Sequence, residues 1–414
     1  MSTATADTLT SGREPGRSYT DLWLITIGHA FTHWYPATFY VLLPLIGNEL
    51  GLTYVQIGSI LAIQHVAGAI SNVPGGLIVD SVSRKGILMA ISLAWIGLPY
   101  LIMGFVDAYW MLLTCAALVG MGNNFWHPTA IPLLGDLYPN RRGLMMSFHA
   151  MAGNVGDALA PLAAGALLVV LSWRSLMVLN VLPGMLMAVV LLIYFAAPQP
   201  GYTQPAGTSG GTQALHVLRT LLHNKTVAML CIGSTFRTMT QISLLTFLPV
   251  FLANELGYSA LLVGACLFGL QAAGFAATPV AGYLSDRIGR RQIIVFCMGV
   301  SMLLLVFMGF AGRSMAFVFF VAFLGFFLFA VRAVLQAWML DAAPPGMAGT
   351  SIGLMFGMQS VGAAIGPIIG GLIADRYGLD ATFYFLAVTI LIANLFMFFT
   401  PVPERKAVAS GSAP

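Results

Sequence analysis

Long apolar stretches alternate with short polar segments along almost the whole chain. A helix needs about 20 apolar residues to cross a bilayer, and helices are favoured there because each one satisfies its own backbone polar groups. The period-two alternation of barrel strands is absent from the sequence. The pattern therefore predicts an all-α membrane protein with twelve transmembrane helices, at 19–47, 54–80, 86–105, 109–137, 143–171, 175–197, 225–254, 258–285, 290–311, 314–341, 347–374 and 381–401.

The longest polar interval divides the chain near its middle. Residues 198–224 are rich in Thr, Gly and Ser, a composition typical of a flexible linker. We expect this linker to join an N-terminal six-helix half at 19–197 to a C-terminal six-helix half at 225–401. Short tails at 1–18 and 402–414 complete the predicted organisation.

An internal repeat relates the two halves. Asp80 corresponds to Asp286, and Gly156 corresponds to Gly362, at a constant offset of 206 residues. Similar residues flank each pair, so the halves share one design. The repeat predicts two pseudo-symmetric six-helix bundles.

Charge is scarce, and its distribution predicts an orientation. Only 8% of the residues are charged, against roughly 25% in a soluble domain. Of the 18 Lys and Arg residues, thirteen lie near span ends on the side of the termini and three on the other side. The positive-inside rule then places both termini in the cytoplasm. We expect a multi-pass protein of a bacterial inner membrane.

Charged residues at the predicted cytoplasmic ends of the helices suggest a gate. Ion pairs between these ends could latch the two halves together, and alternating access requires a latch with two arrangements. The simpler alternative is that the charges only orient the helices. The candidate gate residues are Asp80, Arg84, Lys85, Asp136, Arg141, Arg142, Asp286, Arg290, Arg291 and Asp341.

Ionisable residues inside the membrane are costly, so each one suggests a function. Asp157 is the only acidic residue placed deep within a predicted span, and His127 and His149 lie in the same or the preceding span. These three are the candidates for proton coupling. The alternative for Asp157 is a structural pairing with an arginine or a helix terminus, and each histidine has the alternative of a satisfied core position.

Arg237 and Arg332 lie deep within spans of the second half, and they favour an anionic substrate. An arginine remains charged, and its planar fork suits a carboxylate or phosphonate. A structural role, in which Asp157 or backbone carbonyls satisfy both arginines, stays open. Together with polar and aromatic neighbours on other spans, they form the candidate substrate site, which comprises His29, His33, Trp34, Asn123, Trp126, Arg237, Gln241, Arg332 and Gln336.

The loop segments 76–85 and 282–291 carry a motif similar to that of the major facilitator superfamily, a Gly followed by Asp and then basic residues. A narrower resemblance, to the fosmidomycin-resistance-type branch, rests on 118–122, 125–128 and 152–156. The resemblance implies the twelve-helix fold and proton-driven antiport of drugs and similar compounds, and hence drug resistance.

Several positions depart from the pattern of that family. Ser83 replaces a loop glycine, and Thr129 stands where a glutamate is expected. His29 and His33 in the first span are also unusual. The fold and transporter class therefore carry over better than the coupling residue or the substrate.

The sequence thus predicts a secondary active transporter, a proton-coupled exporter of a small anionic or amphiphilic, drug-like organic compound that works by alternating access. Proton-coupled uptake of an organic anion, and transport of a metal ion or metal chelate, are the alternatives. The histidines have no fixed ligand spacing, so no metal site or cofactor is predicted. No nucleophile motif, phosphate loop or HExxH motif points to an enzyme. The expected partners are the substrate, protons and lipid, without nucleic acid, and we expect a monomer.

Overall fold

The computed structural model of the protein is built from helices. It describes residues 19–82, 84–123, 125–138, 141–195, 219–311, 316–344 and 347–401. The predicted tails and residues 198–218 of the predicted linker lie outside these ranges. The helices are α1 Thr20–Leu50, α2 Tyr54–Ser81, α3 Lys85–Met103, α4 Tyr109–Asn123, α5 Trp126–Leu137, α6 Arg142–Leu167, α7 Trp173–Tyr194, α9 Lys225–Asn254, α10 Ala260–Ile288, α11 Arg290–Ala311, α12 Ala316–Ala342, α13 Ala348–Tyr377 and α14 Asp380–Phe399.

The all-α prediction is confirmed for the described part of the chain. Nine of the helices described there are long and apolar enough to cross a membrane. The helices follow the twelve predicted spans in order, and their ends differ from the predicted ends by a few residues.

The fourth predicted span, 109–137, is not one continuous helix. It consists of α4 and α5, which end and begin on either side of residue 124. Pro128 is the third residue of α5. Proline is tolerated in the first turn of a helix, where its missing N–H would have no partner inside the helix. The break places His127 at the start of a new helix.

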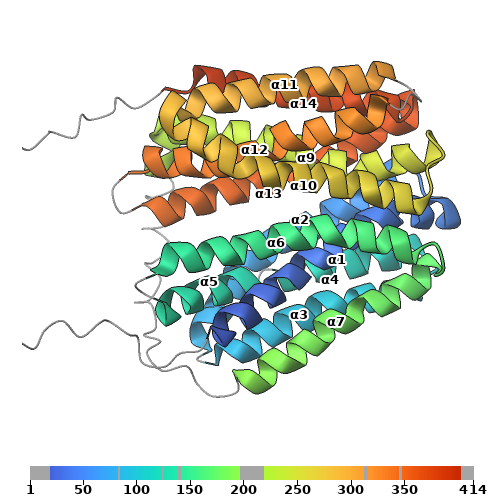
Figure 1. Ribbon diagram of the computed structural model, residues 1–414, viewed down its shortest axis with the longest axis horizontal. Coiled ribbons are helices and arrows are strands. Elements are labelled where there is room, and N and C mark those ends of the chain that lie inside the picture. The colour runs from blue at the N-terminus through green and yellow to red at the C-terminus, as the bar shows by residue number, and fades with distance from the viewer. Residues whose placement is uncertain are drawn as a thin grey trace, which may run out of the picture.

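The helices form two bundles that lie side by side (Figure 1). In the first bundle α1 packs on α6, α2 on α4 and α3 on α7, and in the second α9 packs on α13 and α14, and α10 on α12. The bundles meet where α2 packs against α13 and where α6 packs against α10. These two contacts occupy corresponding places in the repeat.

Glycine allows the two bundles to approach so closely. A Cβ atom added at Gly58 in α2 would collide with the carbonyl oxygen of Pro367 in α13. A Cβ added at Gly264 in α10 would collide in the same way with the carbonyl oxygen of Pro161 in α6. Small residues are typical of membrane helices whose backbones touch. Each bundle thus supplies one glycine and one proline to equivalent contacts.

Polar contacts also join the bundles, at the end away from the chain termini. The carboxylate of Asp375 in α13 accepts hydrogen bonds from the backbone N–H groups of Tyr54 and Val55 at the start of α2, at 2.8 and 3.0 Å. The side-chain amide of Asn48 donates to that of Asn254 at 3.0 Å. The carboxylate therefore caps a helix of the opposite bundle, where the helix dipole favours negative charge.

The glycine contact predicts a position-specific loss of stability. Gly264→Ala should lower the free energy of unfolding by about 1–3 kcal/mol, because a methyl group is forced into a packed site. The measurement is the unfolding temperature of the purified protein in detergent.

Gly269→Ala is the matched control for this substitution. Gly269 lies in the same helix, and nothing lies within 4 Å of a Cβ added there. Equal unfolding temperatures for the two variants would contradict the assigned role of Gly264.

Candidate functional site

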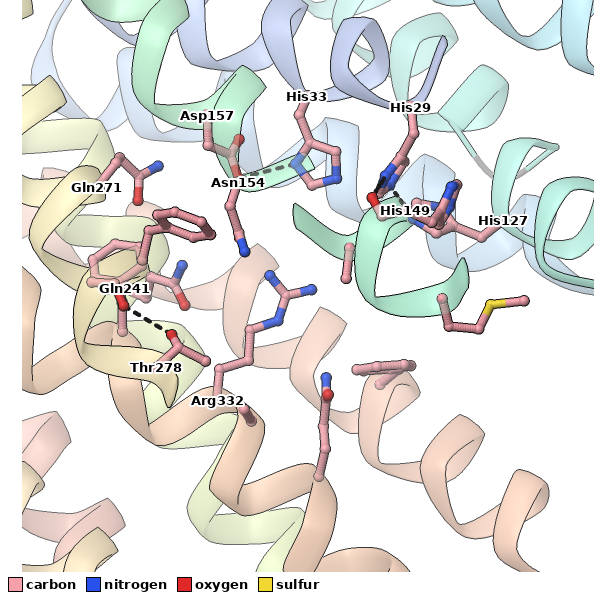
Figure 2. A pocket seen from close by; sticks show the side chains of 18 of the residues that line it. His29, His33, His127, His149, Asn154, Asp157, Gln241, Gln271, Thr278 and Arg332 are labelled. Carbon is pink, nitrogen blue, oxygen red and sulfur yellow. Dashed lines mark hydrogen bonds and ion pairs between the residues drawn. The ribbon is translucent and has the colours of Figure 1, made fainter. Parts of the chain in front are cut away.

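A cavity of about 410 Å³ lies between the two bundles. Residues of α1, α5 and α6 line it on one side, and residues of α9, α10, α12 and α13 line it on the other. Figure 2 shows the histidines and Asp157 facing Arg332 across the space. The predicted site residues that line the cavity are His29, His33, His127, His149, Asp157, Gln241, Arg332 and Gln336.

One wall holds a carboxylate paired with an imidazole. His33 and Asp157 come from α1 and α6, and His33 Nδ1 lies 3.0 Å from Asp157 Oδ2. About a quarter of each side chain is exposed. An Nδ1–H that donates to a carboxylate leaves the Nε2 atom of the ring as an acceptor. The pair thus has both a proton-accepting carboxylate and a proton-accepting nitrogen.

Three further imidazoles pack beside this pair. His29 Nδ1 lies 2.7 Å from the backbone carbonyl oxygen of His149, and His29 Nε2 lies 3.1 Å from His127 Nε2. The rings of His29 and His149 are stacked, with centroids 3.8 Å apart and planes at 11°. Together, His29, His33, His127 and His149 form what we call the histidine cluster.

The local sequence of α6 makes room for this cluster. A Cβ added at Gly153 would lie 2.9 Å from the ring of His29 and 3.0 Å from that of His33. A Cβ added at Gly156 would collide with the carbonyl oxygen of Ala30 in α1. The two glycines let α1 lie directly on α6, so that the imidazoles reach Asp157 and the backbone of His149.

Among the described residues, the facing wall carries one cation, Arg332, beside several amides. Arg332 of α12 points toward Asn154 and the His33–Asp157 pair (Figure 2). The side chain is exposed to the cavity, and within the described residues its guanidinium has no hydrogen-bond or ion-pair partner. Gln241, Gln271 and Gln336 line the same wall. This wall can bind an anion and donate hydrogen bonds to its polar groups.

Four of the predicted substrate-binding residues lie away from the cavity lining. Arg237 is buried, and its guanidinium donates to the carbonyl oxygen of Leu328 at 3.0 Å. Trp34 donates to Asn180 at 2.6 Å. Trp126 is fully buried beside His29, and Asn123 ends α4.

Trp34, Trp126 and Arg237 each share a helix with cavity-lining residues but point to its other sides, whereas Asn123 lies on α4, from which no residue lines the cavity. Arg237 precedes Gln241 by one helical turn, and yet its side chain turns toward the α12 backbone. A spacing of four residues predicts only approximately that two side chains share a face of a helix. The packing of the neighbouring helices decides which of them reach the cavity.

Several lining residues were absent from the sequence prediction. They are Asn154, Gln271 and Thr278, with Met146, Phe275, Phe329 and Phe356 among the apolar ones. Asn154 lies three residues before Asp157, and that spacing on one helix could have identified it. Gln271 stands alone in a long apolar stretch, which was a further signal.

Five of the predicted gate residues have contacts within their own bundles. Arg290 pairs with Asp286 at 2.6 Å and with Asp341 at 3.2 Å, all in the second bundle. In the first bundle Arg141 donates to Tyr19 and Arg142 to the carbonyl oxygen of Gly135. Arg84 and Asp136 are exposed, Lys85 is buried, and Arg291 is half-buried. The side chain of Asp80 lies outside the described part of the structure. A latch between the bundles at this end stays a prediction.

Comparison with known proteins identifies a common family. The family model of the Major Facilitator Superfamily matches residues 22–275 and 230–414. The fosmidomycin resistance protein of Escherichia coli K12 is 24% identical over 400 residues, which cover 94% of each chain. The hexuronate transporter of Bacillus subtilis 168 is 26% identical over 365 residues, which cover 83% of this chain and 85% of the transporter.

A solved structure has the same fold. The crystal structure of a bacterial homolog of the human lysosomal transporter Spinster, inward-facing and unoccupied, aligns with a TM-score of 0.81. The alignment covers 94% of this chain and 98% of that one, at 18% sequence identity. The twelve-span architecture is therefore that of solved transporters.

Proposed function

This chain belongs to the Major Facilitator Superfamily, and from that premise we propose that it is a proton-coupled secondary transporter that exports a small anionic or amphiphilic, drug-like organic compound. Its substrate binds in the cavity between the bundles, and alternating access exposes that cavity to one side of the membrane at a time. The charge asymmetry of the loops supports a bacterial inner membrane location with both termini in the cytoplasm.

The observation that carries the proposal is the unpaired guanidinium of Arg332. A charged side chain inside a membrane protein either pairs with another group or faces a water-filled cavity, and Arg332 faces the cavity without a partner among the described residues. An anionic substrate supplies that partner during each transport cycle. The amides of Gln241, Gln271 and Gln336 then hold the polar groups of the same compound.

Proton coupling is assigned to the His33–Asp157 pair on the facing wall. A proton bound by this pair removes negative charge from the wall opposite Arg332, so the electrostatic field in the cavity changes with each proton taken up. His127 and His149 lie beside the pair and face the same cavity. They provide a path for the proton to the cavity.

Export is the direction that we infer from the relatives. The fosmidomycin resistance protein matches nearly the full chain, and its name denotes resistance to a drug, which export of that drug would provide. Uptake is the second candidate, because a protonated wall and Arg332 both attract an anion, and joint binding of proton and anion is the basis of symport. The name of the hexuronate transporter, also matched over most of the chain, denotes an anionic cargo.

Everted vesicles with an imposed pH gradient separate the two directions. Exchange of internal protons for external compound supports export. Uptake stimulated by an inward proton gradient in right-side-out vesicles would overturn export and favour the second candidate.

Replacing Arg332 tests the anion site. A thermal-shift screen of anionic antibiotics, phosphonates, organic acids and metal chelates should give hits with the unmodified protein. Arg332→Gln should weaken their binding at least about tenfold, because a charge-assisted hydrogen bond contributes about 1.5–3 kcal/mol. Arg332→Lys should retain part of the affinity, since the charge remains but the fork is lost.

Arg219→Gln is the control for this test, because Arg219 is exposed and is not one of the residues that line the cavity. If the compounds found in the screen bind the Arg332→Gln variant as tightly as they bind the Arg219→Gln variant, Arg332 is not part of the substrate site.

Asp157→Asn tests the coupling role. The variant should lose proton-driven transport while retaining measurable substrate binding, because the amide cannot take up and release a proton. Transport is measured in vesicles under an imposed pH gradient, and binding is measured by the thermal shift. Transport at the unmodified rate would exclude Asp157 from coupling.

Cross-linking the two bundles at the end away from the chain termini tests alternating access. Asn48→Cys combined with Asn254→Cys places two thiols where the amides now meet. Bridging them with a short bifunctional thiol reagent should stop transport, because the bundles can no longer separate there. The native cysteines Cys115, Cys231, Cys266 and Cys297 are buried.

The two single-cysteine variants, treated with the same reagent, serve as controls. Transport that continues in the bridged protein would contradict movement at this end.

A further inference from the structure

The histidine cluster brings three imidazoles to one point in space. His29 and His33 come from α1, and His127 comes from α5. One ring nitrogen of each lies within 4.8 Å of one ring nitrogen of each of the others. We propose that these three nitrogens form a binding site for one divalent transition-metal ion of the zinc class, in the wall of the cavity.

The hydrogen bonds of the rings determine which nitrogens are available. In His29 the Nδ1 atom is engaged by the backbone carbonyl of His149, so its N–H is at Nδ1 and Nε2 carries the lone pair, which faces His127 Nε2. In His33 the Nδ1 atom is engaged by the Asp157 carboxylate, which again leaves Nε2. A metal-binding histidine usually has its second nitrogen held by a carbonyl or carboxylate in this way.

The spacing also suits a metal ion. Tetrahedral zinc with Zn–N bonds of about 2.0–2.1 Å places its ligand nitrogens about 3.3–3.4 Å apart. The Nε2 atoms of His29 and His127 are 3.1 Å apart. Binding needs a small separation of these atoms and a shift of the proton of His127 from Nε2 to Nδ1, since the nitrogen that binds a metal must carry a lone pair and the neutral imidazole keeps one N–H.

His149 provides a second, independent observation. Its side chain is only 4% exposed, and neither of its ring nitrogens has a hydrogen-bond partner among the described residues. An unpaired buried polar group costs about 1–3 kcal/mol. Its ring stacks on that of His29 in the same cluster, so an unsatisfied nitrogen donor lies beside the three proposed ligands.

The ligand chemistry selects the class of ion. Imidazole suits zinc, copper, nickel and iron, whereas calcium and magnesium take oxygen ligands. Three protein ligands leave a fourth position open toward the cavity, and Arg332 faces that space. An anionic group held between the ion and Arg332 would pair both charges. This last link rests on the proposed function, whereas the metal site does not.

Cobalt titration tests the site directly. The full-length protein is purified in detergent without a polyhistidine tag, and Co²⁺ is added while the visible absorption is recorded. We expect the d–d bands of tetrahedral cobalt, saturating at one ion per chain, and their displacement by Zn²⁺. Isothermal titration calorimetry with Zn²⁺ should also give a stoichiometry of one ion per chain.

Variants of the cluster separate this site from surface binding. His33→Ala and His127→Ala should each abolish the cobalt bands. Asp157→Asn should weaken Zn²⁺ binding by about 10–100-fold, as expected when the group that orients a ligand is lost. His65→Ala and His223→Ala, which lie outside the cluster, should bind as the unmodified protein does. The unfolding temperature of each alanine variant without metal shows whether it folds. Where His33→Ala or His127→Ala does not fold, the corresponding glutamine variant, His33→Gln or His127→Gln, is used instead.

Several outcomes would overturn the proposal. They are the absence of saturable cobalt bands in the unmodified protein, cobalt binding that survives in His33→Ala and His127→Ala, and binding lost equally in the two control variants. No organic compound is used in these titrations, so a failed search for an anionic substrate leaves their result unaffected.

Discussion

The contact between α1 and α6 is the one on which the chemistry of the cavity depends. These helices touch because Gly156 has no side chain where the carbonyl oxygen of Ala30 approaches, and Gly153 leaves room for two imidazoles. This proximity allows His33 to reach Asp157 and allows His29 to reach the backbone of His149. A larger side chain at either glycine would move α1 away and separate the titratable groups.

The two bundles are alike in how they pack and unlike in what they present. Equivalent glycine–proline contacts, Gly58 with Pro367 and Gly264 with Pro161, join them on both sides of the interface. The cavity between these contacts has a histidine and carboxylate wall and an arginine and amide wall. Symmetric packing is compatible with the proposed rocking of one bundle on the other, while the asymmetric walls place the proposed anion site opposite the proposed coupling pair.

Several polar side chains away from the cavity have hydrogen-bond partners inside the protein, in contrast to the guanidinium of Arg332. Arg237 finds a backbone carbonyl, and Trp34 finds the side chain of Asn180. At the end away from the chain termini, Asp375 caps α2 with both carboxylate oxygens. Within the described residues Arg332 stands apart from these, and its exposure to the cavity makes its charge available to a ligand.

The sequence alone determined the fold class, the twelve spans and the repeat, because lipid imposes a hydrophobic length that each span must meet. It also identified Asp157 and Arg332, since a charge within an apolar stretch is conspicuous. Only the tertiary structure decided that the fourth span is two helices, that Arg237 turns away from the cavity, and that His127 meets His29 across 98 residues of chain. Those outcomes depend on which helices touch and at what rotation, and a glycine at a distant contact controls this as much as the local residues do.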